Sequence, residues 1–364
     1  MNIDIIYGTR PEIIKLAPLI LELKKNNVYR TTVTFSGQHL NMVKPYIEWF
    51  EIQNDYELNA FLNHQTLGKL SSNILEKYSE NIIQNKIDLV IVQGDTITSL
   101  MGAQAAFLNG KNVIHVEAGL RSGNNKSPFP EEISRKMISS LADWHFCPTE
   151  LNKENLKREG ISENVIEVVG NTVVDSVQFT LKKNKENNFK SVFAEFILVT
   201  LHRRESWDRS LTAICEGIYR FCSERPTANL VIPLHKNEIV RKQIQDVLGN
   251  LKNVTLTEQL EYKEMISALA ECKFVLTDSG GIQEEAVTLN KKVFVARDES
   301  DRPEALKTNL CEIVGRDSAR IYSKMILEFD KPSSKNANDN ITYGDGFASK
   351  RIVLSIEKFV SNLK

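Results

Sequence analysis

Short apolar runs alternate with amphipathic helical patterns along the whole chain. In the first half, the apolar runs predict strands within residues 2–8, 31–37, 87–95, 112–119 and 164–171. In the second half, they predict strands within residues 196–202, 228–235, 253–259, 273–281, 291–298 and 311–317. After the first strand, the apolar residues Leu16, Leu19, Ile20 and Leu23 follow the 3.6-residue spacing of a helix. This alternation is typical of parallel sheets that are covered by helices on both faces.

Two such series in 364 residues predict two doubly wound, Rossmann-like α/β domains. The helical pattern of residues 172–183 fades into a polar stretch at 184–191, where the second series has not yet begun. We therefore expect an N-terminal domain over residues 1–170 and a C-terminal domain over 171–345. Apolar positions near the end predict a terminal amphipathic helix within 346–364, which we expect to pack back on the N-terminal domain.

The composition of the chain argues against several classes of function. The chain has 46 Lys and Arg against 47 Asp and Glu, which argues against a nucleic-acid surface. No apolar run reaches the ~18 residues of a membrane span, and the N-terminus lacks a signal-peptide pattern, so a cytoplasmic protein is expected. The five cysteines form no CxxC pair and lie mostly in apolar runs, which predicts buried thiols rather than disulfides or metal ligands.

Charged, imidazole or glycine residues follow nearly every predicted strand. The first half has Gly8 to Glu12 with Lys15, Gly37 to His39, Gln93 to Thr96, and Glu117 to Ser122; the second half has His202 to Glu205, His235 to Asn237, Ser279 to Gly281, and Arg302 to Glu304. Because ligands bind beyond the carboxyl ends of parallel strands, these residues predict a shared cleft between the domains. Asp95-Thr96 alone would be a helix cap. His115 lies inside a predicted strand and His145 lies in the strand-like run WHFCP, so both are predicted to be core residues.

The glycine pair after the strand at 273–277 has two explanations. Ser279-Gly280-Gly281 could form a tight turn that needs positive φ, or could bring bare amides to a phosphate at a helix N-terminus. These residues alone do not decide between the two. Glu285, one turn later, could bind a ribose, which favours a nucleoside diphosphate. No GxGxxG follows a strand and no GxxxxGK[ST] occurs, so neither a dinucleotide nor a P-loop is predicted. No metal-ligand spacing is present, so no metal site is predicted.

Carboxylates of the first half, Asp95, Glu117, Glu131 and Glu132, could perform general acid/base chemistry or stabilise an oxocarbenium-like charge on a sugar. The chain also resembles a known protein family. The resemblance lies in the segments GTRPEIIKLAPLI, GQH, VQGDT, HVEAGLRS, PFPEEISRKM, GNTVVDSV, LHRRES, DSGGIQEEA and RPEA. These segments, in this order over almost the whole chain, resemble the non-hydrolysing UDP-N-acetylglucosamine 2-epimerases.

The resemblance implies a GT-B-like fold, usually in a homodimer, and the reversible conversion of UDP-N-acetylglucosamine to UDP-N-acetylmannosamine. UDP is eliminated across carbons 1 and 2 and then adds back, so no redox cofactor is implied. The product would be a precursor of a surface polysaccharide. By resemblance, the catalytic set is Lys15, Asp95, Glu117, Glu131 and His202; the UDP-binding residues are Arg10, His235, Ser279, Gly280, Gly281, Glu285 and Arg302. Which carboxylate takes the proton stays open.

Many bacterial members of this family hold a second UDP-N-acetylglucosamine as an activator. The resemblance places that effector site at Gln38, His39, Asn41, His64 and Arg203. Relatives have Gln and Arg at the positions of Asn41 and His64, so a shorter side chain and a mostly neutral imidazole predict weaker activator binding. The alternative is that both residues are tolerated changes at the rim of the site.

Three rival functions are considered. A hydrolysing 2-epimerase would release N-acetylmannosamine and UDP, but its first loop departs from GTRPE. A GT-B glycosyltransferase would need an acceptor. A non-catalytic nucleotide-sugar sensor would keep the UDP residues but lose the acids Asp95, Glu117 and Glu131. Neither nucleic acid nor membrane is an expected partner.

Overall fold

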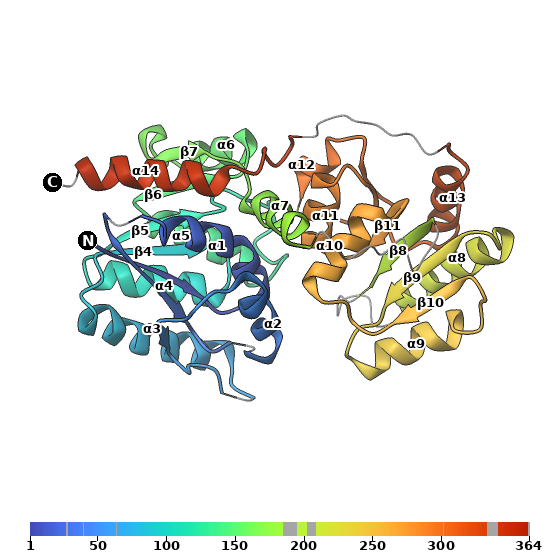
Figure 1. The fold of residues 1–364 in the computed structure, drawn as a ribbon, viewed down its shortest axis with the longest axis horizontal. Helices are drawn as coiled ribbons and strands as arrows, with labels where there is room; N and C mark the ends of the chain where they lie inside the picture. The colour runs from blue at the N-terminus through green and yellow to red at the C-terminus, as the bar shows by residue number, and fades with distance from the viewer. Residues whose placement is uncertain are drawn as a thin grey trace. The chain divides into compact units, whose positions relative to one another are not determined.

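The computed structural model describes residues 1–26, 28–38, 40–62, 64–184, 195–201, 209–300, 302–332 and 341–362. The chain divides into two compact units (Figure 1). Unit 1 comprises Met1–Phe179 with Tyr343–Lys364, and unit 2 comprises Thr180–Thr342. The sequence placed the corresponding boundaries after residues 170 and 345. Each unit contains a parallel sheet with helices packed on it, so the predicted fold class is confirmed.

Unit 1 is built on a seven-stranded parallel sheet in the order β3-β2-β1-β4-β5-β6-β7. Its elements are β1 (Asn2–Tyr7), α1 (Arg10–Leu23), β2 (Arg30–Phe35), α2 (Leu40–Phe50), β3 (Tyr56–Glu57), α3 (Leu67–Gln84), β4 (Leu89–Gln93), α4 (Ile97–Leu108), β5 (Asn112–Val116), α5 (Glu131–Leu141), β6 (Trp144–Cys147), α6 (Glu150–Arg158), β7 (Ile166–Val168), the start of α7 (Thr172–Lys183), and α14 (Ala348–Asn362). The strand order reverses direction between β1 and β4. Loops that follow these two strands therefore meet at the topological switch point, where such folds bind ligands.

The core of unit 1 explains why the strands read as continuous apolar runs. All five residues of β4 are buried, because α3 and α4 cover one face of the sheet and α1 covers the other. On α4, a Cβ atom at Gly102 would lie 2.7 Å from Cγ2 of Ile6. A glycine at this position therefore lets α4 lie close against β1, which carries the start of the candidate site.

Unit 2 repeats this plan with a six-stranded parallel sheet in the order β10-β9-β8-β11-β12-β13. Its elements are β8 (Phe196–Thr200), α8 (Arg209–Glu224), β9 (Asn229–Pro233), α9 (Glu238–Leu248), β10 (Val254–Thr257), α10 (Tyr262–Glu271), β11 (Phe274–Thr277), α11 (Gly280–Thr288), β12 (Lys292–Val295), α12 (Pro303–Leu306), β13 (Cys311–Ile313) and α13 (Ser318–Phe329). Its switch point lies between β8 and β11. A single apolar cluster from β8, β9, α8, α9 and α13 forms much of its core.

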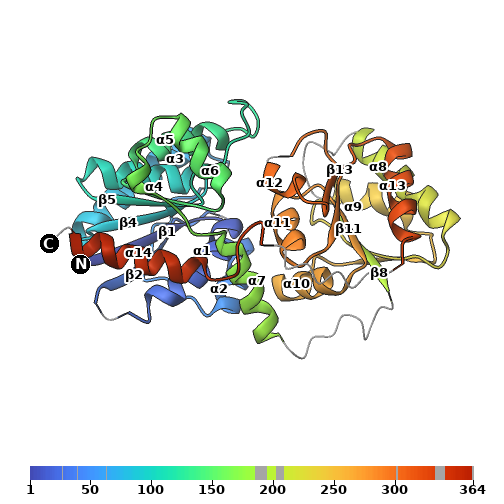
Figure 2. The ribbon, with the colours of Figure 1, turned by 90° about the horizontal axis from the view of Figure 1, so that it is seen from above.

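The last helix, α14, follows unit 2 in sequence but belongs to unit 1 (Figures 1 and 2). Asp175 of α7 accepts hydrogen bonds from the N–H groups of Ala348 and Ser349, which caps the start of α14. Farther along α14, the ring of Phe359 packs edge-on against Trp144 of β6. The helix is therefore fixed to unit 1 at both its amino-terminal and carboxyl-terminal parts.

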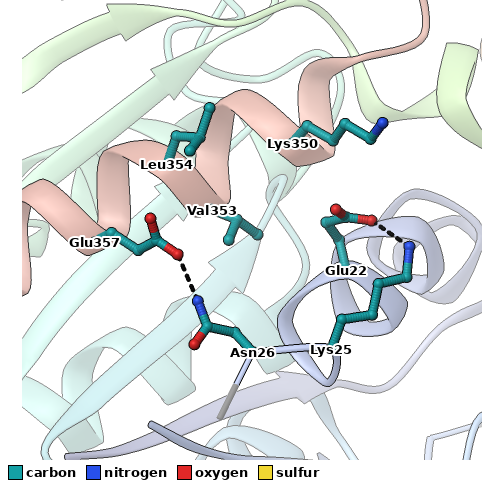
Figure 3. A pocket seen from close by; sticks show the side chains of 7 residues that line it. All are labelled: Glu22, Lys25, Asn26, Lys350, Val353, Leu354 and Glu357. Atoms are coloured by element: carbon teal, nitrogen blue, oxygen red, sulfur yellow. Dashed lines mark hydrogen bonds and ion pairs between the residues drawn. The ribbon is translucent and has the colours of Figure 1, made fainter. Parts of the chain in front are cut away.

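Helices α1 and α14 border a surface pocket of about 420 Å³ (Figure 3). Among the residues that line the pocket, Asn26 donates a hydrogen bond to Glu357 at 2.5 Å, and Lys25 forms an ion pair with Glu22. None of the predicted site residues lines this pocket. In the described parts of the chain, no helix has both the length and the apolar character needed to cross a membrane.

All five cysteines are buried and none forms a disulfide, as the sequence predicted. Burial raises the pKa of each thiol to about 12. The thiols are therefore protonated at neutral pH and are poor nucleophiles.

Candidate active site

The turn between β1 and α1 begins the site of unit 1. A Cβ atom at Gly8 would clash with the hydroxyl groups of Ser36 and Thr98, so only glycine allows the turn to lie this close to α4. Arg10 is the first residue of α1 and is partly exposed. On the buried side of the helix, the Nζ atom of Lys15 lies 2.5 Å from Oε1 of Glu117. These two predicted catalytic residues, 102 positions apart in sequence, therefore form a buried ion pair.

Glu117 is held in an unusual backbone conformation directly after β5. Its φ is 64°, which a non-glycine residue adopts only at an energetic cost. The amide group of Gln93, at the end of β4, donates a hydrogen bond to Oε2 of Glu117. Both oxygens of this carboxylate are thus occupied, one by a cation and the other by an amide donor.

Asp95 is held by an arginine that the sequence did not single out. Nε and Nη2 of Arg135, on α5, lie 2.7 and 2.6 Å from Oδ2 of Asp95. Nη1 of the same guanidinium lies 3.1 Å from Glu132. The helix cap at this strand end is Thr96, whose hydroxyl accepts from the N–H of Ser99 at 3.1 Å. Capping therefore explains Thr96, whereas the side chain of Asp95 serves an ion pair.

Glu131 and Glu132 occupy the first turn of α5. Glu132 is fully buried and accepts hydrogen bonds from the N–H groups of Ser122 and Gly123. Burial alone raises the pKa of Glu132, but these N–H donors and the charge of Arg135 outweigh it, so the pKa is lowered. Glu132 is therefore a structural anion that orients Arg135. Glu131 is half-buried beside it.

His115 and His145 are neighbours in the sheet and both are fully buried, which confirms that they are core residues. Burial lowers the pKa of His115 to about 3 and that of His145 to about 4, and the positive charge of Arg121 acts in the same direction. Both imidazoles are therefore neutral at pH 7. Nε2 of His115 lies 2.8 Å from the carbonyl oxygen of Gly94, so this ring supports the turn that carries Asp95.

In unit 2, the glycine pair opens α11 directly after β11. Gly280 and Gly281 are the first two residues of the helix and neither has positive φ, so the tight-turn explanation is wrong. Ser279 is the cap, and its hydroxyl accepts from the N–H of Ile282. No described atom beyond the helix's own backbone and the adjoining residues comes within 4 Å of a Cβ atom built on Gly281. The amino end of α11 is therefore open at this residue, as close approach of a ligand requires.

Side chains on α11 and α12 form a second buried group. Nε of Arg302 lies 2.5 Å from Oε1 of Glu284. Gln283 donates to the carbonyl oxygen of Ser279 at 3.2 Å and accepts from Ser300 at 2.7 Å. Glu285 is buried in the same helix.

The remaining UDP-site residue, His235, follows β9. Its Nδ1 atom accepts from the N–H of Asn237 at 3.1 Å, so in the neutral ring Nε2 carries the proton. At the expected effector site, Gln38 accepts a hydrogen bond from Thr98 at 3.3 Å, whereas Asn41 and His64 are exposed. The predicted residues His39, His202 and Arg203 lie outside the described residues.

The structure thus joins Lys15 to Glu117 directly and ties Asp95 to α5 within unit 1. In unit 2 it gathers Ser279, Gly280, Gly281 and Glu285 on α11. The sequence analysis missed three residues that support these groups, namely Arg135, Gln283 and Glu284, and it placed Gln93 at a strand end without its contact to Glu117. Only Arg135 had a usable signal, since it lies one helical turn after Glu132, where opposite charges pair.

Comparisons with known proteins place the chain in a family. The family model described as UDP-N-acetylglucosamine 2-epimerase matches residues 21–357. The chain belongs to the UDP-N-acetylglucosamine 2-epimerase family. It is 39% identical over 370 residues to the UDP-N-acetylglucosamine 2-epimerase of Neisseria meningitidis, covering 98% of this chain and 100% of that protein.

Solved structures agree with this placement. A N. meningitidis enzyme bound to UDP-GlcNAc superposes with a TM-score of 0.92 at 39% identity, over 98% of this chain and 100% of that chain. A co-structure with UDP from S. aureus gives a TM-score of 0.91 at 36% identity, over 99% and 97%. The protein is thus an isomerase of the GT-B-like α/β class. The non-hydrolysing type fits its bacterial relatives, and neither the hydrolysing nor the glycosyltransferase alternative is favoured.

Proposed function

We propose that the protein interconverts UDP-N-acetylglucosamine and UDP-N-acetylmannosamine at carbon 2 of the sugar, without hydrolysis. The observation that carries this proposal is the buried pair of Lys15 and Glu117 at the switch point of unit 1, in a chain of this family. Titratable groups with fixed partners at a ligand-binding edge are typical of catalytic sites.

The proposed reaction is an elimination followed by an addition. The bond from carbon 1 to the UDP oxygen breaks and the proton of carbon 2 leaves, which gives a glycal-like intermediate and UDP. A proton then returns to the opposite face of carbon 2 and UDP adds back to carbon 1. Because the departure of UDP develops positive charge on the sugar, fixed carboxylates lower the barrier. Asp95, Glu117 and Glu131 are the carboxylates proposed for this work, with Lys15 and His202 in the same catalytic set.

The contacts of the two tethered acids suggest different roles. Glu117 has a cation on one oxygen and an amide donor on the other, so both of its oxygens are engaged. It is suited to stabilise positive charge on the sugar. Among the described residues, the contacts of Asp95 come from Arg135 to Oδ2, and we propose Oδ1 as the oxygen that exchanges a proton with the sugar.

UDP is proposed to bind in unit 2. The amides at the start of α11 suit the diphosphate, since a helix N-terminus favours anions, and Gly281 leaves room for close approach. Glu285 is assigned to the ribose, with Arg10, His235 and Arg302 as further UDP contacts. The N. meningitidis and S. aureus relatives hold UDP-GlcNAc and UDP, which supports a UDP-sugar as the ligand.

We also propose a homodimer, a cytoplasmic location and a role in supplying a surface polysaccharide. The effector site at Gln38, His39, Asn41, His64 and Arg203 is proposed to bind activator weakly. The exposed positions of Asn41 and His64 agree with residues at the rim of such a site.

Proton NMR of UDP-N-acetylglucosamine with the enzyme in deuterated water tests the proposed reaction. We expect UDP-N-acetylmannosamine with deuterium at carbon 2. Retention of the original hydrogen would overturn the elimination mechanism. Free N-acetylmannosamine would point to hydrolysis, and a substrate that stays unchanged until an acceptor is added would point to a transferase.

A further inference from the structure

Glu12 joins two separate turns of unit 1 through a single buried carboxyl group. Its side chain is in the first turn of α1 and is only 1% exposed. Oε2 accepts hydrogen bonds from the N–H groups of Gly8 and Thr9, at 3.1 and 2.7 Å. Oε1 lies 2.7 Å from the hydroxyl of Thr96 and 2.8 Å from that of Ser99. Two N–H groups and two hydroxyls, from two segments more than 80 residues apart, thus converge on one side chain.

These two segments meet at the switch point of the sheet. Gly8 and Thr9 follow β1, whereas Thr96 and Ser99 cap and begin α4 after β4. Strands β1 and β4 are neighbours, and the strand order reverses between them. Glu12 therefore bridges the two loops between which the fold places its ligand.

The bridged segments carry the proposed catalytic groups. Lys15 lies one turn beyond Glu12 in α1, and Asp95 directly precedes Thr96. The hydroxyl of Ser99 also lies 2.5 Å from the carbonyl oxygen of Gln93, whose side chain binds Glu117. A shift of α1 relative to α4 would therefore separate Lys15 from Glu117 and displace Asp95.

We propose that Glu12 is a positioning residue of the epimerase: it fastens the start of α1 to the start of α4, and so holds Lys15, Glu117 and Asp95 in their catalytic arrangement. This inference rests on the proposed function, because it assumes that these three residues act on the substrate. Glu12 itself has no role in contacting the sugar.

The proton count at this bridge indicates which variant conserves it. Three short contacts link Glu12 to Thr96, Glu12 to Ser99, and Ser99 to the Gln93 carbonyl, but the two hydroxyls supply only two protons. A protonated carboxyl supplies the third. Burial raises the pKa of Glu12, while its hydrogen bonds with Thr96, Thr9 and Ser99 oppose this shift. A glutamine has the same length, accepts from the two N–H groups and donates toward the hydroxyls, so it preserves the bridge.

Asp4 provides a matched control in the same unit. It is a fully buried carboxyl on β1, with the hydroxyls of Thr32 and Tyr78 at 2.6 and 2.7 Å. Its partners lie on β2 and α3, and none belongs to the proposed catalytic set. Alanine at Asp4 and alanine at Glu12 each remove a buried carboxyl and leave hydroxyl partners unsatisfied, so both variants are expected to be less stable.

The experiment compares Glu12→Ala, Glu12→Gln and Asp4→Ala in the full chain. It measures kcat and KM for UDP-N-acetylglucosamine at a temperature where each variant is folded by circular dichroism. We expect Glu12→Ala to lower kcat ~10²-fold with little change in KM, the scale of a small misplacement of reacting groups. Glu12→Gln should retain kcat within about fivefold, whereas Asp4→Ala should lower the melting temperature but keep kcat within about twofold.

Amide hydrogen exchange supplies a readout that does not depend on activity. Glu12→Ala should speed exchange at Gly8 and Thr9 and at the start of α4, while Asp4→Ala should leave those amides protected.

A folded Glu12→Ala with wild-type kcat, or equal kcat losses in Glu12→Ala and Asp4→Ala, would overturn the proposal. If Glu12→Ala does not fold, Ser99→Ala removes one leg of the bridge and should lower kcat about tenfold; an unchanged kcat there overturns it equally. If the wild-type enzyme does not epimerise, the proposed function is refuted instead. The exchange experiment then still tests whether Glu12 fastens α1 to α4.

Discussion

The two units of the molecule share a doubly wound parallel sheet, but different kinds of residue lie at their switch points. In unit 1, the loops after β4 and β5 present Asp95 and Glu117, which pair with Arg135 and Lys15. In unit 2, the loop after β11 presents the amino end of a helix with two glycines, and the nearby carboxylate of Glu284 is paired with Arg302. A fixed set of carboxylates suits chemistry, and open backbone amides suit binding of an anion. On the proposed assignment, one fold supports both tasks, and the loops decide which task a unit performs.

The largest expected effect comes from the acids of unit 1. Asp95→Asn, Glu117→Gln and Glu131→Gln should each lower kcat by ~10²–10⁴-fold, the usual contribution of a positioned proton-transfer group. UDP affinity should stay near that of the wild type, because the nucleotide is assigned to unit 2. Steady-state kinetics and calorimetry with UDP measure the two quantities. A variant with near-normal turnover would remove that acid from the catalytic set.

A buried acid of unit 1 outside the site should make stability depend on pH. Burial raises the pKa of Asp4 from 3.8 to about 6, although hydrogen bonds from Thr32 and Tyr78 oppose the shift. The folded state therefore binds the proton more tightly than the unfolded chain. The stabilisation is fully present below about pH 4 and is lost as the pH rises through about 6, with a total of about 3 kcal/mol.

Urea unfolding between pH 4 and 7.5 measures this contribution as the difference between the wild type and Asp4→Asn. The variant lacks the titrating group, so its free energy of unfolding should fall less over this range. Parallel pH profiles for the two proteins would show that Asp4 does not titrate in this range.

A substitution at Gly281 can separate the proposed UDP binding by unit 2 from the stability of that unit. An alanine fits the protein, since no described residue beyond the adjoining helix backbone occupies that space, and it favours a helix by up to about 1 kcal/mol over glycine. The same methyl group should obstruct a diphosphate at the amides of α11. We expect Gly281→Ala to raise the melting temperature slightly and to weaken UDP binding by about 10–10²-fold. Unchanged UDP affinity by calorimetry would mean that the diphosphate binds elsewhere.

The smallest expected effect concerns the effector site. By the resemblance, Asn41 and His64 stand where many relatives have Gln and Arg, and an imidazole lacks the bidentate guanidinium fork of an arginine. The loss of one such bond weakens activator binding about tenfold. The reverse reaction, from UDP-N-acetylmannosamine alone, should therefore depend only modestly on added UDP-N-acetylglucosamine. Initial rates with and without a trace of activator decide this, and an absolute requirement met at low micromolar activator would contradict it.

Much of this arrangement was predictable from the sequence because it depends on local patterns. Apolar runs marked the strands, and the helical period marked α1, α7 and α14, since burial on one face imposes both. The two residues of β3 are too few to form a pattern. The pairing of Asp95 with Arg135 joins residues 40 positions apart, and the hydrogen bond from Gln93 to Glu117 depends on which strands are adjacent. Neither contact has a local signature.

The glycine pair and the cap before α4 show a second limit. The same letters, Ser279-Gly280-Gly281, fit both a positive-φ turn and a helix start, because glycine permits each backbone conformation. At Asp95-Thr96, either side chain is a good cap, and only the packed structure assigns the cap to Thr96 and the ion pair to Asp95. Residue type limits the choices in such cases, and tertiary contacts select among them.

The return of α14 to unit 1 has a consequence for synthesis on the ribosome. Unit 2 is an insertion between two parts of unit 1, so the surface of α1 and β6 that α14 covers stays bare until residues 343–362 emerge. Unit 2, whose sheet is formed by one continuous segment, does not need α14 to complete its fold. A released chain that ends before Tyr343 should therefore protect unit 2 from protease and leave Trp144 exposed. The helix that is made last thus completes the unit that is made first.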